Sequence, residues 1–403
     1  MKRRVLAVIL TAVLLLSLAG CNHEAKADKW VGPDSYDGVQ SKTGYFYSRE
    51  GFLYYTDFAT GTSVCLCSRA GCLHNDEDLC DSWIGSGAEM FFWEEKLYYL
   101  QTSAYGPQLY RRNQDGTGLA TVATLCQAYM EEDRAISIQL QEKVVTGGYL
   151  YYAAEVQAVV NEGGHSTHKT QYYLLQQVDL KTGKEKTILK DELSFSLVAA
   201  KGNRIRYRTG EETKGLEGIE QPGHDTICNA YKNTKVWIAE MDTGTGEETV
   251  LLESNVYDLF SVEIVDDERI IYMSYESDDP YSAIYYSCDL RTGKSEFYYE
   301  GDLVSTIGGR YSLYQDSQRK ETLLVDIETK QELPIHAFYG GDTETYIKMV
   351  NPVGDYVILR RYCRTASGSS SVGEQVYFFV PISALADGLQ EDDCTDYYTW
   401  KKG

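Results

Sequence analysis

The chain has 403 residues, and its 60 acidic side chains outnumber its 38 lysines and arginines to give a net charge of −22 at pH 7. This balance argues against binding to nucleic acid and against direct adsorption to anionic lipid, because both need clustered basic side chains. Thirty-four tyrosines against eleven phenylalanines and seven prolines favour a strand-rich protein, since aromatic residues suit a half-buried pleated surface.

The first twenty residues predict an export signal. Three basic residues at positions 2–4 precede an apolar run at 5–16, which is too short to cross a bilayer at about 20 residues per helix. Leu-Ala-Gly-Cys follows at positions 18–21. The segment resembles a bacterial lipoprotein signal peptide, which implies cleavage after residue 20 and acylation of Cys21 by diacylglycerol and a further chain such as palmitate. An ordinary secretory signal with an incidental Cys21 is the alternative.

The lipoprotein interpretation predicts where the mature chain lies. It would be anchored to the cell membrane by its lipid and face the extracytoplasmic side, at the cell surface. Removal of residues 1–20 takes away three positive charges and no acids, so the net charge falls from −22 to −25. Residues 21–40 have little apolar content and predict a flexible tether, and residues 41–403 predict one domain.

A short aromatic strand recurs seven times after the tether. The copies share a turn residue followed by alternating aromatic and aliphatic residues, and they lie at 51–55, 96–100, 148–152, 203–207, 268–272, 309–314 and 354–359. We interpret each as the first strand of a repeated unit, because period-two patterns bounded by glycine or acidic residues indicate strands.

Turns repeat with the strands. Most copies follow an Asp-x-x-Thr-Gly pattern, in which Asp can accept backbone hydrogen bonds and Gly supplies a positive φ. They begin at Asp57, Asp179, Asp242 and Asp289, with an Asn113 variant and a copy without glycine at Asp326.

Units of this size, spaced by roughly 40 to 60 residues, predict an all-β fold, a β-propeller of about seven blades, with six or eight as alternatives. A closed ring usually pairs strands from the two chain ends, so we expect residues 375–403 to complete the ring. A two-sheet sandwich is the competing interpretation.

Two motifs carry a family resemblance. Leu53-Tyr54-Tyr55-Thr56-Asp57 is similar to the Tyr-Trp-Thr-Asp (YWTD) repeat of low-density-lipoprotein-receptor-like propellers, with Tyr in place of Trp, and residues 113–117 (Asn-Gln-Asp-Gly-Thr) resemble the turn of TolB-like propellers. With the signal peptide, residues 41–403 resemble a group of bacterial lipoproteins with a predicted β-propeller, mostly from Firmicutes. The resemblance implies a fold and a location, and it implies a Cys-rich segment after the first unit.

The densest group of reactive side chains lies at positions 65–80. It contains Cys65, Cys67, Cys72, His74 and Cys80. Three thiolates and an imidazole from Cys67, Cys72, His74 and Cys80 are a ligand set that a closed structural zinc site uses. Exported proteins also oxidise neighbouring cysteines to disulfides, and redox or ligand-binding chemistry is a third alternative. We expect a local structural staple, either disulfide or metal, with no cofactor beyond a structural zinc ion.

The sequence contains none of the common enzyme signatures: G-x-S-x-G, H-E-x-x-H, the phosphate-binding P-loop or a dinucleotide fingerprint. We therefore expect a non-enzymatic propeller, with no catalytic residues, that binds a protein or glycan partner. The alternative is an exported propeller-fold carbohydrate-active enzyme, a glycosidase or lyase, because carboxylate pairs among 60 acids can be selected only by geometry. Adjacent tyrosines such as Tyr98 and Tyr99 could stack on sugars, but alternate strand positions face opposite sides, which favours packing of one tyrosine between blades while its neighbour reaches the rim.

Overall fold

The computed structural model describes residues 29–401 except for 34–37, 78, 102–105, 128, 132–133, 163–164, 211–223, 256–258, 260, 275–282, 308–310, 317–320, 327–328, 336–344, 354–355, 365–371 and 388–394. The predicted signal, Cys21 and the tether up to residue 28 lie outside the described residues. No helix within the described part of the chain is long and apolar enough to cross a membrane.

The first two sheets each contain four consecutive antiparallel strands. Sheet 1 comprises β1 (Gly38–Gln40), β2 (Gly44–Arg49), β3 (Phe52–Asp57) and β4 (Ser63–Cys65). Sheet 2 comprises β5 (Glu89–Trp93), β6 (Lys96–Gln101), β7 (Gln108–Asn113) and β8 (Ala120–Thr124).

The next two sheets include the longest hairpin among the described strands. Sheet 3 comprises β9 (Tyr129–Glu131), β10 (Arg134–Thr146), β11 (Tyr149–Glu162), β12 (His165–Asp179) and β13 (Glu185–Asp191). Sheet 4 comprises β14 (Ser194–Lys201), β15 (Arg204–Gly210), β16 (Lys235–Asp242) and β17 (Glu248–Asn255), with helix α2 (His224–Lys232) between β15 and β16.

A seven-stranded sheet follows. Its strands are β18 (Ser261–Ile264), β19 (Arg269–Ser274), β20 (Ala283–Asp289), β21 (Lys294–Ile307), β22 (Tyr311–Asp316), β23 (Glu321–Asp326) and β24 (Glu332–Ile335). The first part of β21 pairs with β20 and its last part pairs with β22. We therefore treat β18–β21 as sheet 5 and β21–β24 as sheet 6, two four-stranded groups that share one strand.

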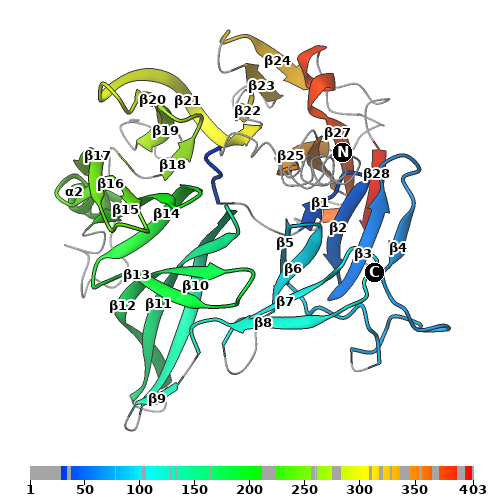
Figure 1. The fold of residues 1–403 in the computed structure, drawn as a ribbon. Coiled ribbons are helices and arrows are strands. Elements are labelled where there is room, and N and C mark those ends of the chain that lie inside the picture. Colours follow the sequence, from blue (N-terminus) through cyan, green and yellow to red (C-terminus); the bar gives the residue numbers. More distant parts are fainter. Residues whose placement is uncertain are drawn as a thin grey trace, which may run out of the picture.

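Sheet 7 comprises β25 (Thr345–Val353), β26 (Tyr356–Arg364), β27 (Val372–Pro381) and β28 (Thr395–Lys401), with the 3₁₀ helix η1 (Ile382–Asp387) after β27. The sheets follow one another around a common centre (Figure 1). The first strands of adjacent sheets are neighbours, and in sheet 3 this place is taken by β10, which follows the short β9. The contacts join β1 with β5, β10 with β14, and β14 with β18. The all-β propeller architecture is confirmed, whereas the number of blades stays a prediction.

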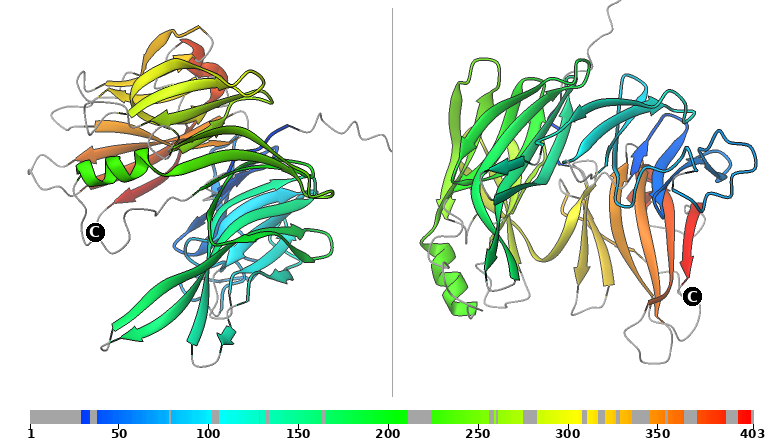
Figure 2. Two further views of the ribbon diagram at one scale, coloured as in Figure 1. Left: turned by 90° about the vertical axis from the view of Figure 1, so that its left-hand side faces the viewer. Right: turned by 90° about the horizontal axis from the view of Figure 1, so that it is seen from below.

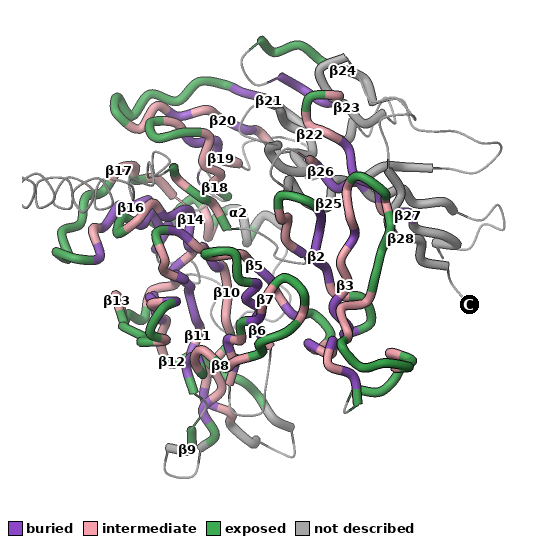
Figure 3. Tube along the Cα trace, turned by 45° about the vertical axis from the view of Figure 1, so that its right-hand side comes forward, coloured by how far each residue is buried: buried purple, intermediate pink, exposed green. Residues whose placement is uncertain are grey.

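The core lies between adjacent sheets. Leu109 of sheet 2 and Leu150 of sheet 3 are fully buried in one such layer, and Leu175 of sheet 3 and Ile205 of sheet 4 are fully buried in the next. The outer strands β13 and β17 contain no buried residue, and β13 is mostly exposed (Figure 3). The packing role predicted for one tyrosine of a pair is confirmed at positions 98 and 99. The second tyrosine does not lie exposed at the rim as expected, because Tyr98 and Tyr99 are both buried, at 1% and 2% exposure.

The predicted turns form as expected. The turn threonine donates its backbone N–H to the Asp Oδ1 at 2.8–3.0 Å in the copies that begin at Asp57, Asp179, Asp242, Asp289 and Asp326. In the copy without glycine, Lys330 takes the left-handed φ of 60°.

The register of the repeat differs from the prediction. Residues 96–100 lie in the second strand of sheet 2, and the described parts of four other copies also lie in the second strand of a four-stranded group. The copy at 148–152 lies in β11, which follows β10 and the short β9 in sheet 3, and residues 51–55 lie in the third strand of sheet 1. The second strand of sheet 1 is β2, which carries its own aromatic run. The reason is that sheet 1 presents two consecutive aromatic strands, and the sequence pattern alone does not say which one is equivalent to the others.

Within the strands that the structure describes, the ring does not close by pairing strands from the two chain ends, in contrast to the expectation from the sequence. Among the described strands, β28 pairs with β27 only and β1 pairs with β2 only. Each terminal sheet takes its strands from one stretch of chain, and the two sheets meet through side chains. The ring of Tyr45 lies edge-on to that of Phe379, with centroids 5.3 Å apart.

Candidate metal centre

The predicted Cys/His group lies in the connection from sheet 1 to sheet 2, residues 66–88, between β4 and β5. Its last part is fixed to sheet 1, because Leu53 N–H donates to Ser82 O at 2.8 Å and Ile84 N–H donates to Gly51 O at 2.9 Å. Ile84 is fully buried in the layer between the two sheets. The base of the connection is therefore part of the core, while its middle is exposed.

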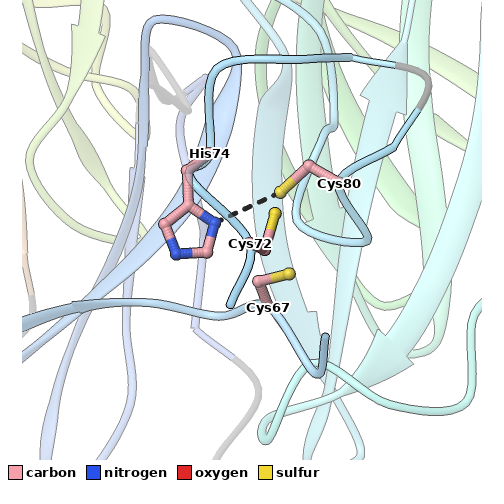
Figure 4. A group of neighbouring side chains, drawn as sticks. All are labelled: Cys67, Cys72, His74 and Cys80. Atoms are coloured by element: carbon pink, nitrogen blue, oxygen red, sulfur yellow. Dashed lines mark hydrogen bonds between the residues drawn. The ribbon is translucent and has the colours of Figure 1, made fainter. Parts of the chain in front are cut away.

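Four of the five predicted residues converge in the middle of this connection. The side chains of Cys67, Cys72, His74 and Cys80 point toward one another (Figure 4), and their ligand atoms all lie within 4.8 Å of one another. His74 Nδ1 lies 3.4 Å from Cys80 Sγ. Nitrogen and sulfur ligands on one tetrahedral zinc ion are separated by about 3.6 Å. The arrangement fits a four-coordinate Cys₃His site.

Two tight turns produce this convergence from residues close in sequence. Gly71 has a φ of 74° and His74 has a φ of 52°, and Cys72 N–H donates to Arg69 O at 3.3 Å. The second turn returns the chain to Cys80, because Asp76 Oδ1 accepts the backbone N–H of Leu79 at 3.2 Å. His74 is one of few non-glycine residues here with a left-handed φ, a conformation that a side chain disfavours.

Cys65 lies outside the group of four but is linked to it. The Ser82 hydroxyl lies 3.0 Å from Cys65 Sγ and 2.9 Å from Cys80 Sγ, and Ser82 is fully buried. Hydrogen bonds from a second layer of side chains orient metal ligands and stabilise thiolates. The sequence did not single out Ser82, because a serine between two strands carries no chemical signature of its own.

Two arginines surround the site. Arg69 Nε forms an ion pair with Asp81 Oδ1 at 2.7 Å, and Ser68 also donates to Asp81. Arg112 of β7 is 1% exposed, and it donates to Asp81 O at 3.1 Å and to Tyr99 Oη at 2.9 Å. A divalent ion with three thiolates has a net charge of −1, which nearby cations would offset.

Acidity differs among the thiols of Cys65, Cys67 and Cys72. Burial opposes ionisation of Cys67, but backbone hydrogen bonds from Arg69 and Asp81 and contacts with the other thiols outweigh burial and lower its pKa. A backbone hydrogen bond at His74 favours the Cys72 thiolate, yet burial and the neighbouring sulfurs raise its pKa overall. Burial raises the pKa of Cys65. Cys67 is thus the thiol of these three that ionises most easily.

No disulfide joins the cysteines whose side chains the structure describes. Cys65, Cys67, Cys72, Cys80, Cys126 and Cys288 are all free thiols. Of the two staples expected from the sequence, the geometry therefore fits the metal and gives no support to the disulfide. Cys126 does not belong to the group: its Sγ lies 2.9 Å from Tyr152 Oη in the core between sheets 2 and 3, and burial raises its pKa to about 11.

No protein-family model and no curated protein sequence matches the chain. Among solved structures, a puromycin-hydrolyzing peptidase of Mycobacterium tuberculosis has a TM-score of 0.53 at 10% identity, over 88% of this chain and 54% of that chain. An oligogalacturonate lyase in complex with manganese has a TM-score of 0.47 at 12% identity, over 82% and 86% of the two chains. TolB from Acinetobacter baumannii has a TM-score of 0.39 at 13% identity, over 87% and 76%. At these identities the likeness concerns the fold alone. The succession of antiparallel sheets around one centre is what makes the chain a β-propeller.

Proposed function

We propose that the protein is a lipid-anchored, extracytoplasmic β-propeller that binds a protein or glycan partner and is not an enzyme. In this proposal Cys67, Cys72, His74 and Cys80 hold a structural zinc ion. The bound ion would cross-link four points of an exposed connection that has few apolar side chains to order it.

The observation that carries the proposal is the closed ligand set. Structural zinc sites use four protein ligands, whereas catalytic sites keep one position for water or substrate. The three cysteines and His74 supply all four positions, so a bound ion has none left for a substrate. The described residues contain no second group of three or more Cys, His, Asp or Glu side chains with such convergence.

Binding is favoured over catalysis because of where this site lies. It orders a connection between sheets 1 and 2, at the outside of the ring, and Leu73 and Leu79 on the same connection are 80% and 59% exposed. A rigid loop with exposed apolar side chains is suited to contact a partner. The alternative function, an exported glycosidase or lyase, would require a pair of carboxylates elsewhere.

One experiment compares the two functions directly. The mature protein is applied to a glycan array and, in parallel, incubated with the same oligosaccharides while the products are measured by mass spectrometry. Saturable binding with intact sugars supports a glycan-binding protein. Time-dependent cleavage would favour the enzyme, and binding confined to a protein partner in a cross-linking experiment on intact cells would favour the protein-binding form.

A further inference from the structure

The two faces of the ring carry different connections. Strands alternate in direction within each sheet, so the turn from the first to the second strand and the turn from the third to the fourth lie on one face, called here the turn face. Contacts between these turns confirm this: Thr243 N–H donates to Asn203 O at 2.7 Å, and Leu180 N–H donates to Gly148 O at 3.0 Å. Helix α2, between the second and third strands of sheet 4, extends from the opposite side (Figure 2).

The segment before β1 is attached to sheet 4. Val31 and Ala200 exchange two backbone hydrogen bonds, each 2.9 Å long. The guanidinium of Arg206 lies 3.9 Å from the ring centroid of Trp30, and Arg206 Nε also donates to Glu240 at 2.9 Å. Residues 29–33 therefore form an anchor strap, fixed by strand pairing and by a cation–π contact.

The strap is attached near the centre of the ring and near its turn face. β14 is the first strand of sheet 4, and first strands are the neighbours around the centre. Ala200 is the residue before the last one of β14, next to the turn at 202–203. β1 begins at Gly38 in sheet 1, so the chain reaches sheet 1 only after it has been fixed to sheet 4.

We infer that the strap orients the propeller on the membrane, with the turn face toward the bilayer and α2 directed away from it; this rests on the proposed lipidation of Cys21. Nine residue steps separate Cys21 from Trp30, and they span at most about 31 Å. A path from the centre of the turn face to the opposite face first covers the radius of the domain, about 25 Å at this size. It then runs down the rim by the length of a six-residue strand, about 20 Å. The tether is too short to pass around the rim to the opposite face.

The charge of the turn face indicates how this face is held near the bilayer. Acidic turn residues such as Asp57, Asp179 and Asp242 gather on the turn face, and they do not attract anionic headgroups. Attachment through the lipid and the strap, and not adsorption, therefore holds this face near the membrane. The opposite face is left accessible to a partner outside the cell.

The orientation is tested with the lipidated full-length protein in vesicles that contain a small fraction of lipid with an amine-reactive headgroup. Lys181 and Lys184 are exposed on the turn face, and Lys232 is exposed at the end of α2. We expect at least fivefold more lipid adduct at Lys181 and Lys184 than at Lys232, measured by peptide mass spectrometry. Equal adducts at Lys181 and Lys232, or more at Lys232, would overturn the inference.

A strap variant and a second anchor separate the inference from the proposed function. Trp30→Ala with Val31→Pro removes the ring and the N–H that contact sheet 4, and it should raise the Lys232 adduct at least threefold; Phe297→Ala, at a side chain 63% exposed, should not. The measurement is repeated with residues 1–21 replaced by a histidine tag on nickel-chelating lipid. If Cys21 carries no lipid, the proposed anchoring fails while this second measurement still decides the orientation.

Discussion

Arg112 on β7 donates a hydrogen bond of 3.1 Å to the backbone oxygen of Asp81, the residue that follows the candidate ligand Cys80. The contact joins sheet 2 to the connection that carries the candidate metal site. Arg112 is 1% exposed, so a buried cation helps to hold the segment that carries the candidate ligand thiols. The stability of the site and the packing of sheets 1 and 2 are therefore coupled.

Arg112→Met is expected to lower the free energy of unfolding by about 2 to 4 kcal/mol, because Asp81 O and Tyr99 Oη lose their donor in a buried place. Lys184→Met is the control, since Lys184 is exposed in a turn, and its effect should stay within about 0.5 kcal/mol. Urea unfolding measures both. Equal effects of the two substitutions would show that the buried contact contributes little.

Zinc binding gives a second prediction. The mature protein should bind one zinc ion per chain, visible as added mass in the native spectrum and absent after denaturation. Substitution of Cys67, Cys72 or Cys80 by Ser should abolish binding, whereas Cys288→Ser, at a buried cysteine in sheet 5, should leave it intact. Chelation should lower the free energy of unfolding by about 4 kcal/mol if the free zinc concentration is 1,000 times Kd. A native mass without added zinc, together with alkylation of Cys67, Cys72 and Cys80 in the native protein, would contradict the metal site.

The buried thiol of Cys126 leads us to expect a decrease in the free energy of unfolding at high pH. Burial raises its pKa from 9.0 to about 11 in the folded protein, so the folded state favours the protonated thiol. This contribution is fully present below pH 9 and is lost as the pH rises from about 9 to 11, by about 2 to 3 kcal/mol in total. Cys126→Ala should therefore flatten the decrease of unfolding free energy over this range. An identical slope in both proteins would rule out the buried thiol as its source.

Lipidation of Cys21 is tested by the Cys21→Ser variant. It should move from the membrane fraction to the soluble fraction, because the predicted acyl chains are the anchor. The mature N-terminus of the unchanged protein should carry the mass of a diacylglyceryl cysteine. Membrane retention of Cys21→Ser with an unmodified N-terminal peptide would contradict the lipoprotein interpretation.

Deletion of residues 375–403 tests the closure of the ring. It removes β28 and most of β27, including Val376 and Phe379, which are 3% and 2% exposed. Phe379 packs against Tyr45 of sheet 1, so the truncation should expose both ends of the ring and aggregate. Size-exclusion chromatography and thermal melting monitored by circular dichroism measure this. A soluble truncated protein with a cooperative transition would argue against closure at this interface.

The sequence by itself determined the local structure of the repeat. Asp and Thr at fixed spacing specify the turns at 179–183 and 289–293, because the hydrogen bonds that make them are local. The ligand types at positions 67–80 were visible for the same reason, since residues so close in the chain can meet at small entropic cost. Thus the all-β class and four candidate ligands followed from residue type and spacing alone.

Tertiary structure decided what joins distant segments. Nothing local indicates that Val31 pairs with Ala200, that Arg112 reaches Asp81, or that Tyr45 packs on Phe379. It also places Cys65 outside the ligand group, because Ser82 lies between Cys65 and Cys80. These relationships depend on how sheets pack around the ring, which residue type and spacing along one chain do not encode.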